Sequence, residues 1–459
     1  MEKDQDYLLN NREKFTRELL DFITIPSIAA LPEHAKDVHR AATWLQQKMS
    51  GVGIQNVEIM DTGGQPAVYG DWMHAGNGKP TVLIYGHFDV QPVDPVELWD
   101  HDPFTPTIKD EKIFARGASD DKGSMFIPII VFEAIYKSSG TFPFNIKFLF
   151  EGEEEIASPK MPEFVSNNVD KLKCDMIFSA DGGQFSESEP NLAVGFKGIL
   201  GFDIEVIGPE TDKHSGLFGG AIANPIMALT QLLSSMKNTD GQITIDGFYN
   251  EVVPLNNEDK AEIARVPFDE KQYLNLTGSV GLDGETGYTA PERIGARPTL
   301  DVNGIWGGYQ GVGTKTVLPS KANAKITCRL VANQKPKEIL KKIEKHVKKF
   351  LPNGVVGKVI PLQDEGDPLL IPKNHRSTEV ARDVLRKVYG KEPYMIRVGG
   401  SIPILSAFYK YLGIHATMFA FQLDDENWHA PNEFFRLSSF YKGQEAYRQL
   451  FHKIGGLSQ

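Results

Sequence analysis

Glutamates follow an apolar, strand-like run in the stretch NIKFLFEGEEEIAS at residues 145–158. Their positions are Glu151, Glu153, Glu154 and Glu155. A charge run of this kind is usually a solvated acidic loop. Carboxylates that are held close together, however, raise one another's pKa unless a cation lies between them. The question is therefore whether other metal-ligating side chains reach the same place.

Four further polar motifs lie next to apolar segments. His87 and Asp89 in GHFDVQP follow the run TVLIYG, and at strand spacing they project from one face. Asp120 and Asp121 in RGASDDKGS lie just before an apolar helix candidate, where an aspartate commonly caps the first turn. Asp181 in SADGG ends the run CDMIFSA, and His429 in DDENWHAPNE follows HATMFAFQ. Singly, each residue has an ordinary structural explanation, because polar side chains near strand ends are usually hydrogen-bonded.

The motifs share one placement in the predicted sheet. Four follow apolar strands and one opens a helix, and in a parallel sheet the loops after the strands lie at one edge. The side chains that could converge there are His87, Asp89, Asp120, Glu154, Glu155, Asp181 and His429. Histidine and carboxylate ligands without thiolates suit zinc, manganese or cobalt in a catalytic site. Two such ions, bridged by a carboxylate and a water, would use this many ligands and leave a base.

The apolar segments predict a fold in which these motifs can meet. Strands are predicted at TVLIYG, FNIKFLF and CDMIFSA, and an apolar helix is predicted between the first two, at about 124–136. This alternation indicates a largely parallel sheet covered by helices on both faces. Helices are also expected at about 6–22 and 34–49, the second stopping at Gly51 and Gly53.

From about residue 197 the pattern changes, and it returns near residue 370. The middle section has predicted strands GFDIEVIG, KANAKITCRLVA and VVGKVIPLQ and helices at 225–237 and 335–350. The last section has helices at 377–389, 402–411 and 437–454 and the strand HATMFAFQ. One domain interrupted by another explains this return better than two domains in series. We predict a catalytic domain of residues 1–196 and 370–459, with a smaller α+β insert at 197–369.

Composition limits the classes of protein that fit. The formal net charge of -11, without a block of Lys and Arg to offset it, argues against nucleic-acid and anionic-membrane surfaces. The first residues have no apolar signal segment, and no run of apolar residues is long enough to span a membrane. The two cysteines, Cys174 and Cys328, fit reduced buried thiols better than a disulfide or a thiolate metal site. We therefore expect a cytoplasmic protein.

Nine motifs, in the family's order, resemble the M20 family of co-catalytic zinc metallopeptidases. The resemblance is greatest to its branch of cytosolic nonspecific dipeptidases and carnosinase-like enzymes. The motifs are GHFDVQP, WDHDPF, RGASDDKGS, EGEEEIAS, SADGG, DKHSG, KTVLPSKANAKITCRL, VGGSIP and NWHAPNE, between residues 81 and 433. This chain departs from the family at Ala157, where a glycine usually follows the glutamate pair, and the difference concerns loop packing more than the ligands.

The resemblance implies a role for each metal ligand. It implies that His87 and Asp181 bind one divalent ion, that Glu155 and His429 bind the other, and that Asp120 bridges the two. Each subunit would thus hold two ions, with zinc expected and manganese or cobalt as alternatives.

The resemblance also implies roles for residues beside the ligands. Asp89 would orient the imidazole of His87, as metal-bound histidines usually require. Glu154 would be the general base, and the peptide between Asp120 and Asp121 would be cis. Glu151 and Glu153 receive no such role, and for them we still expect, in part, the side chains of a solvated acidic loop.

The resemblance implies two residues of the insert that contact a peptide substrate, and two residues of the predicted catalytic domain suit the same role. His214 in DKHSG would stabilise the oxyanion, often from the partner subunit of a dimer formed through the insert, although an isolated loop histidine is ordinarily solvent-facing. Arg329 would bind the substrate carboxylate, although an outward arginine on a strand is usually a surface residue. Gly400 and Ser401 precede a predicted helix, whose free N–H groups suit a carboxylate.

Together these expectations predict hydrolysis of the amide bond of dipeptides or short peptides with a free C-terminal carboxylate. An M20 amidase acting on N-acyl amino acids, of the deacylase or succinyl-diaminopimelate desuccinylase type, is the alternative. A non-catalytic binding protein on the same scaffold would lack a ligand or the base, and none is missing. A redox protein is disfavoured because there are neither thiolate ligands nor a GxGxxG motif after a strand.

Overall fold

A computed structural model describes residues 3–400 and 402–457, which form two compact units. Unit 1 comprises Met1–Ala193, Ile371–Met395 and Pro403–Gln459, and unit 2 comprises Val194–Leu370 and Ile396–Ile402. The chain therefore leaves unit 1 and later returns to it. The short segment 396–402 belongs to unit 2, because the Lys197 N–H lies 3.3 Å from the carbonyl of Val398 and 3.0 Å from that of Gly400.

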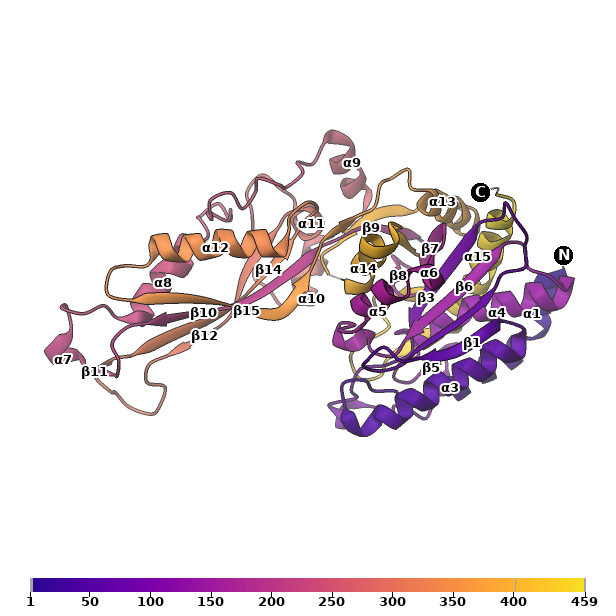
Figure 1. Cartoon of the computed structure of the whole chain (residues 1–459), viewed down its shortest axis with the longest axis horizontal. Helices are drawn as coiled ribbons and strands as arrows, with labels where there is room; N and C mark the ends of the chain where they lie inside the picture. The colour runs from indigo at the N-terminus through magenta and orange to yellow at the C-terminus, as the bar shows by residue number, and fades with distance from the viewer. Residues whose placement is uncertain (1–2, 401, 458–459) are drawn as a thin grey trace. The chain divides into compact units, whose positions relative to one another are not determined.

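Unit 1 is built on a six-stranded sheet in the order β1-β2-β6-β3-β7-β18 (Figure 1). Its strands are β1 (Gln55–Met60), β2 (Ala67–Trp72), β3 (Thr81–His87), β6 (Asn145–Glu151), β7 (Met176–Ser179) and β18 (Ala416–Met418). β3 pairs in parallel with β6 and β7, and β18 pairs in parallel with β7. β2 is antiparallel to both of its neighbours, β1 and β6. Among the described strands of this sheet only β2 runs against the others, so the prediction of a largely parallel sheet is confirmed.

Helices pack on this sheet in two groups. The helices are α1 (Lys3–Asn10), α2 (Arg12–Ile23), α3 (Ala35–Val52), α4 (Lys122–Ser139), α5 (Met161–Asn167), α6 (Val169–Leu172), α13 (Arg376–Tyr389), α14 (Pro403–Leu412) and α15 (Leu437–Gly455). α4 contacts α1, α2, α3 and α15, whereas α14 contacts α5 and α6. α4 is buried along most of its length, which explains its continuous apolar sequence.

Two helix boundaries differ from the prediction. The expected helix at 6–22 is two helices separated at Asn11, whose side-chain amide donates to the Tyr7 carbonyl at 2.8 Å. Such local bonds compete with the helical backbone. α3 continues through Gly51 and ends at Gly53, which has φ of 106°. A Cβ at Gly53 would lie 2.6 Å from the ring of Tyr136, so glycine is required there.

Unit 1 also contains short helices and strands outside the six-stranded sheet. They are η1 (Pro32–His34), η2 (Val96–Leu98), β4 (Thr107–Lys109), β5 (Lys112–Phe114), η3 (Glu154–Ile156), β8 (Gly183–Gln184), β19 (Gln422–Leu423) and β20 (Phe434–Arg436). The strand expected at HATMFAFQ is thus divided between β18 and β19. The chain crosses between the units within β9 (Asn191–Phe196), near β16 (Leu369–Leu370) and within β17 (Tyr394–Val398).

Unit 2 contains a four-stranded antiparallel sheet in the order β12-β14-β10-β15. Its elements are β10 (Gly198–Ile207), β11 (Lys213–His214), α7 (Ser215–Phe218), α8 (Pro225–Ser235), α9 (Asn257–Arg265), α10 (Glu270–Thr277), α11 (Ala290–Ala296), β12 (Thr299–Gly307), β13 (Val317–Leu318), β14 (Lys321–Leu330), α12 (Pro336–Phe350) and β15 (Val356–Gly366). α8 and α12 both pack on strands of this sheet and contact each other.

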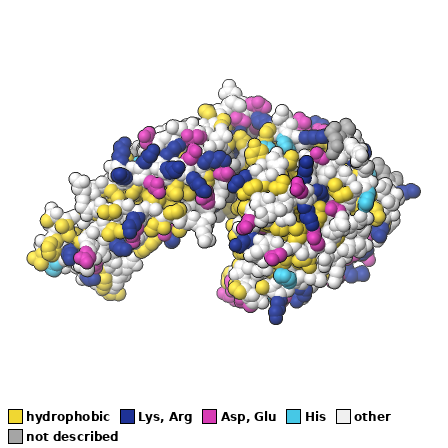
Figure 2. Space-filling model, in the orientation of Figure 1, with side chains coloured by type: hydrophobic (Ala, Val, Ile, Leu, Met, Phe, Trp, Pro, Cys, Tyr) yellow, Lys and Arg dark blue, Asp and Glu magenta, His cyan; other side chains and the backbone are white. Residues whose placement is uncertain are grey.

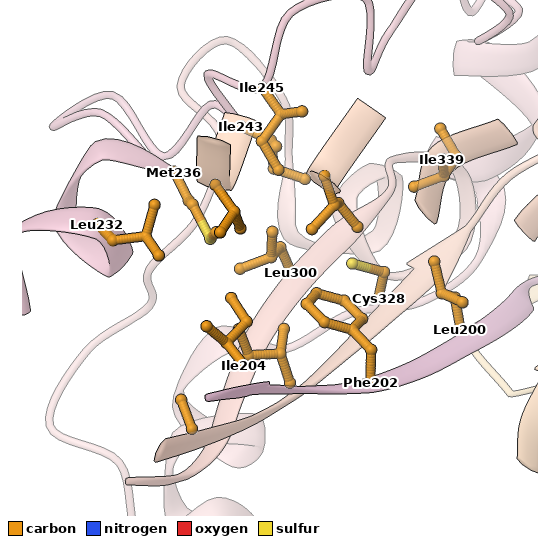
Figure 3. Packing of buried hydrophobic residues seen from close by; sticks show 14 of the residues in the cluster. Leu200, Phe202, Ile204, Leu232, Met236, Ile243, Ile245, Leu300, Cys328 and Ile339 are labelled. Atoms are coloured by element: carbon orange, nitrogen blue, oxygen red, sulfur yellow. The ribbon is translucent and has the colours of Figure 1, made fainter. Parts of the chain in front are cut away.

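The core of unit 2 lies between the sheet and these two helices. Leu200, Phe202 and Ile204 project from β10 into the cluster, in which Leu232 and Met236 lie at one end and Ile339 at the other (Figure 3). On α12, buried apolar residues alternate with lysines that form an exposed face (Figure 2). This packing gives unit 2 a hydrophobic core of its own.

Candidate functional site

Asp120 lies between two histidines. Its Oδ1 is 3.1 Å from Nε2 of His87, and its Oδ2 is 3.0 Å from Nε2 of His429. Nitrogen and oxygen ligands bind zinc at roughly 2.0–2.2 Å, so two ligands of one ion are themselves about 3 Å apart. The two oxygens of one carboxylate thus face two separate positions where a cation fits.

The described residues contain two groups that could each hold a metal ion. One group is His87, Asp120 and Asp181, and the other is Asp120, Glu155 and His429. Within each group the potential ligand atoms all lie within 4.8 Å of one another. The structure therefore brings the five predicted ligands together in unit 1, with Asp120 common to both groups.

The strands and loops of unit 1 deliver these side chains to one edge of the sheet. His87 ends β3 and lies opposite Glu151, the last residue of the parallel strand β6. Glu154 and Glu155 follow in η3, and Asp181 follows β7. This is the edge beyond the carboxyl ends of parallel strands, where the chemistry of such sheets collects.

Asp89 is fully buried and makes contacts that the sequence did not predict. Its carboxylate oxygens accept hydrogen bonds from the main-chain N–H groups of Glu154 and Glu155, both at 3.1 Å. Its main-chain carbonyl lies 3.1 Å from Nδ1 of His87, closer than its carboxylate at 3.5 Å. Asp89 therefore holds His87 mainly through its backbone, while its side chain fixes the glutamate pair.

Burial makes it costly for these carboxylates to carry their charges together. Burial, and the charge of nearby Asp120, raise the pKa of Glu155 to about 7 and that of Asp181 to about 6. His87 opposes both shifts, and His429 opposes that of Glu155. Burial also raises the pKa of Glu154 well above its usual range, with further increases from Asp181 and Glu155. A dication would relieve this repulsion and displace the protons, so the donor set fits a metal centre.

The pKa values of the two histidines are raised as well, because carboxylates lie beside them. Hydrogen bonds that the His429 ring donates to Asp120 and Glu155 raise the pKa of His429 to about 10. Burial lowers the pKa of His87, but its hydrogen bonds with Asp120 and Asp89 outweigh burial and leave it well above its usual value. In the metal-free protein, protonated histidines thus supply positive charge that a cation would otherwise provide.

These shifts predict how the metal-free protein responds to pH. Glu155 and Asp181 keep protons in the folded state that the unfolded chain loses near pH 4. His429 contributes stability that is complete below pH about 6.5 and lost as pH rises toward 10. All three effects have one sign, so the contribution of this cluster to the free energy of unfolding of chelator-treated protein should fall by at least ~1 kcal/mol between pH 5 and pH 8, carried by the two buried carboxylates. Burial lowers the pKa of His415 to about 4 and that of Lys122 to about 7, and these two groups act in the opposite direction, so the contribution of the cluster is measured against Glu155→Gln.

Calorimetric melting curves with and without added zinc would test this prediction. The zinc-loaded protein should show no such fall, because metal affinity rises as its ligands lose protons. Glu155→Gln should flatten the decline of the metal-free form. A metal-free wild-type Tm that declines no more steeply from pH 5 to pH 8 than that of Glu155→Gln would contradict the prediction.

The first two glutamates of EGEEE are not solvated, so that part of the prediction is wrong. Glu151 is fully buried, and its Oε1 accepts from the hydroxyls of Tyr85 at 2.5 Å and Ser158 at 3.0 Å. Glu153 is 2% exposed and accepts the main-chain N–H groups of Gln65 and Lys160. Loop N–H groups bond both carboxyl oxygens of Glu153, and hydroxyl groups bond one oxygen of Glu151, whereas Oε2 of Glu151 is buried without a hydrogen-bond partner among the described residues.

The side chain of Asp121 does not cap the helix that follows it, although an aspartate at this position commonly does. The peptide between Asp120 and Asp121 is cis, as the resemblance implied. Asp121 occupies the N-cap position of α4, but its side chain makes no capping hydrogen bond. Its carboxylate instead accepts from the amide of Gln422 at 3.0 Å and from the His87 N–H at 3.3 Å.

Buried carboxylates that sequence reasoning missed hold the loop that carries Asp120. Glu433 is fully buried, and its carboxylate oxygens are 3.0 Å from each of three main-chain nitrogens and 2.6 Å from the Arg116 guanidinium. The three N–H groups belong to Gly117, Ser119 and Asp120. Glu426 accepts from the Ser119 hydroxyl at 2.6 Å. Both glutamates stand in DDENWHAPNE, but residue spacing does not reveal which distant N–H groups a buried carboxylate will accept.

The residues predicted to contact substrate belong to unit 2. His214 is exposed, and its Nδ1 accepts the Gly216 N–H at 3.0 Å, so the neutral ring carries its proton on Nε2. Arg329 is half-buried on β14, directly opposite Ile199 of β10. Gly400 is exposed, and Ser401 lies outside the described residues. Within the described part of the chain, no helix has the length and apolarity needed to cross a bilayer.

Comparison with known proteins identifies relatives over nearly the whole chain. Residues 83–453 match the family described as peptidase family M20/M25/M40. The chain is 30% identical to the Cys-Gly metallodipeptidase dug1 of Schizosaccharomyces pombe, over 100% of this chain and 99% of that protein. It is 28% identical to the Beta-Ala-His dipeptidase of Homo sapiens, over 100% of this chain and 93% of that protein.

A solved structure has the same fold. The M20 family metallo-carboxypeptidase Sso-CP2 from Sulfolobus solfataricus aligns with a TM-score of 0.82 and 30% identity. The alignment covers 96% of this chain and 99% of that one.

Proposed function

The chain belongs to peptidase family M20/M25/M40, and on that premise we propose that it is a metal-dependent dipeptidase. Its substrates would be dipeptides or short peptides with a free C-terminal carboxylate. The observation that carries the proposal is the Asp120 carboxylate, whose two oxygens face His87 and His429. Relatives over the full length are named as dipeptidases for Cys-Gly and Beta-Ala-His, which favours this substrate class over N-acyl amino acids.

The metal centre in this proposal uses the residues already described. His87 and Asp181 would hold one divalent ion, Glu155 and His429 the other, and Asp120 both. We propose zinc, with manganese or cobalt as alternatives, because the donors are nitrogen and oxygen atoms. When bound, such ions polarise the scissile carbonyl and make the attacking water more acidic.

Glu154 would move the proton. The water oxygen attacks the carbonyl carbon while Glu154 takes the water's proton, and Glu154 then delivers this proton to the leaving nitrogen as the C–N bond breaks. The Glu154 backbone is fixed by the Asp89 carboxylate, so the side chain starts from a defined position. Burial raises its pKa, which suits a group that must both accept and return a proton.

Residues of unit 2 would bind the rest of the substrate. The Nε2–H of His214 would donate to the oxyanion, and Arg329 would pair with the C-terminal carboxylate. The N–H groups of Gly400 and Ser401 would add donors to the same carboxylate.

A panel of dipeptides, their C-terminal amides and N-acyl amino acids, assayed with added zinc, manganese or cobalt, tests the substrate class. We expect hydrolysis of the dipeptides and a kcat/KM lower by about 10²-fold or more for the amides, because the carboxylate partner of Arg329 is lost. Cleavage of N-acyl amino acids with inert dipeptides would instead identify the amidase alternative. Inertness toward both sets would refute the substrate class.

We further propose that the protein is a cytoplasmic homodimer formed through unit 2. Apolar side chains gather around α7 in unit 2 (Figure 2). The exposed apolar residues of α7, α8 and β12 are Leu217, Phe218, Met227, Val302, Ile305 and Trp306. An exposed patch of this kind is typical of a protein interface. The cysteines, Cys174 and Cys328, are both free, which fits a reducing compartment.

Mixing two inactive variants tests whether the subunits share their sites. Neither His214→Ala nor Glu154→Ala homodimers should turn over substrate. If His214 acts on the partner's site, co-expressed chains should recover roughly a quarter of wild-type activity, since half the dimers would be mixed and each would hold one complete site. Two separately tagged His214→Ala chains serve as the control. No recovery in proven mixed dimers would place His214 in its own chain's site.

A further inference from the structure

Gln91 contacts the proposed metal ligand Glu155 at two points. Its side-chain amide nitrogen lies 2.8 Å from Oε2 of Glu155 and 3.2 Å from the main-chain carbonyl of the same residue. Both partners are acceptors, so the amide nitrogen must face them and the amide oxygen must point away. One side chain therefore fixes both the backbone and the carboxylate of Glu155.

A third bond completes the placement of Glu155. Its main-chain N–H donates to the carboxylate of Asp89 at 3.1 Å. The oxygen that Gln91 contacts, Oε2, also lies 3.1 Å from Nε2 of His429. The Glu155 carboxylate is thus held toward His429 before any ion binds.

The other terminal carboxylate of the cluster is held differently. The Asp181 carboxylate accepts from the main-chain N–H of Gly182, its immediate neighbour. Gln91 and Glu155 are far apart in sequence, whereas Asp181 and Gly182 are adjacent. Removing the Gln91 amide would therefore free the rotamer of Glu155 and leave the contacts of Asp181 in place.

We propose that Gln91 is a positioning residue that presets Glu155 for the ion shared with His429, so that the affinity of this ion alone depends on the Gln91 amide. The inference rests on the proposed metal centre. Partners that orient a ligand typically change metal affinity by about 10–100-fold. Without the amide, ion binding would have to order the Glu155 side chain, and this entropic cost would weaken binding.

Zinc titration of metal-free protein, in competition with a chromophoric chelator, measures the two affinities without using activity. Gln91→Ala should weaken one of the two binding events about 10–100-fold and leave the other unchanged. Gln91→Met, which keeps the length but lacks the donor, should give the same loss. Glu155→Ala identifies the affected event, because it should weaken that event most.

Gln46→Ala is the matched control. Gln46 also donates its amide to a carbonyl of unit 1, that of Val57 at 3.4 Å, and its loss should change neither affinity. Unchanged binding in both Gln91 variants, or equal weakening of both events, would overturn the role of Gln91. A wild-type protein that binds fewer than two ions would refute the metal centre itself, which is a distinguishable result.

Discussion

Glu154→Gln should lower kcat by roughly 10²–10⁴-fold while the protein still binds two metal ions per chain. The amide has the size of the carboxylate but cannot accept the proton of the attacking water. Glu154 is absent from both candidate ligand groups, so its loss should leave metal binding intact. The bond from its main-chain N–H to Asp89 does not involve the side chain and should survive the substitution. Steady-state kinetics and metal analysis of the same preparation would measure both quantities.

The neighbouring glutamate provides the control. Glu153 is also buried, but its carboxylate accepts loop N–H groups from Gln65 and Lys160. Glu153→Gln should therefore reduce stability modestly and leave kcat close to wild type. A Glu154→Gln protein that retains more than about a tenth of the wild-type kcat would exclude Glu154 as the general base.

Strongly apolar elements of the fold could be predicted from sequence. β3, β6, β7 and α4 are buried almost completely, and an unbroken apolar run marks such elements. β1 and β12 were missed because neither is buried along most of its length; β1 is largely half-buried, and β12 is largely exposed and contains a bulge. Such strands are ordered by pairing with their neighbours, which local composition does not encode.

In the candidate site, too, some residues could be predicted from sequence and others could not. Histidine and carboxylate positions after strands suggested the ligands, because only a few side-chain types bind divalent ions. The groups that hold those ligands were not foreseen. Glu433, Gln91 and the Asp89 carboxylate act by accepting from or donating to particular groups brought near by the fold. The last two residues of EGEEE lie at the candidate metal groups, where their roles stay predictions, and the first two are buried rather than solvated.

Asp120→Asn should weaken the binding of both ions and reduce turnover below detection. An asparagine offers one oxygen and one NH₂ group, so it cannot present acceptors toward both His87 and His429. The substitution keeps the main-chain N–H that donates to Glu433, so the loop should retain its anchor. Zinc titration of the metal-free variant, with melting curves to verify folding, would measure the effect.

His429→Ala, compared with Asp120→Asn, distinguishes a residue that binds one ion from a residue that binds both. His429 belongs to only one of the two groups, so its removal should weaken one binding event and leave the ion at His87 and Asp181 in place. Asp120→Asn should instead affect both events, because each oxygen of this carboxylate faces a different histidine. If the two variants lost the same single ion, Asp120 would serve one site alone. The two-ion centre would then need another bridging group.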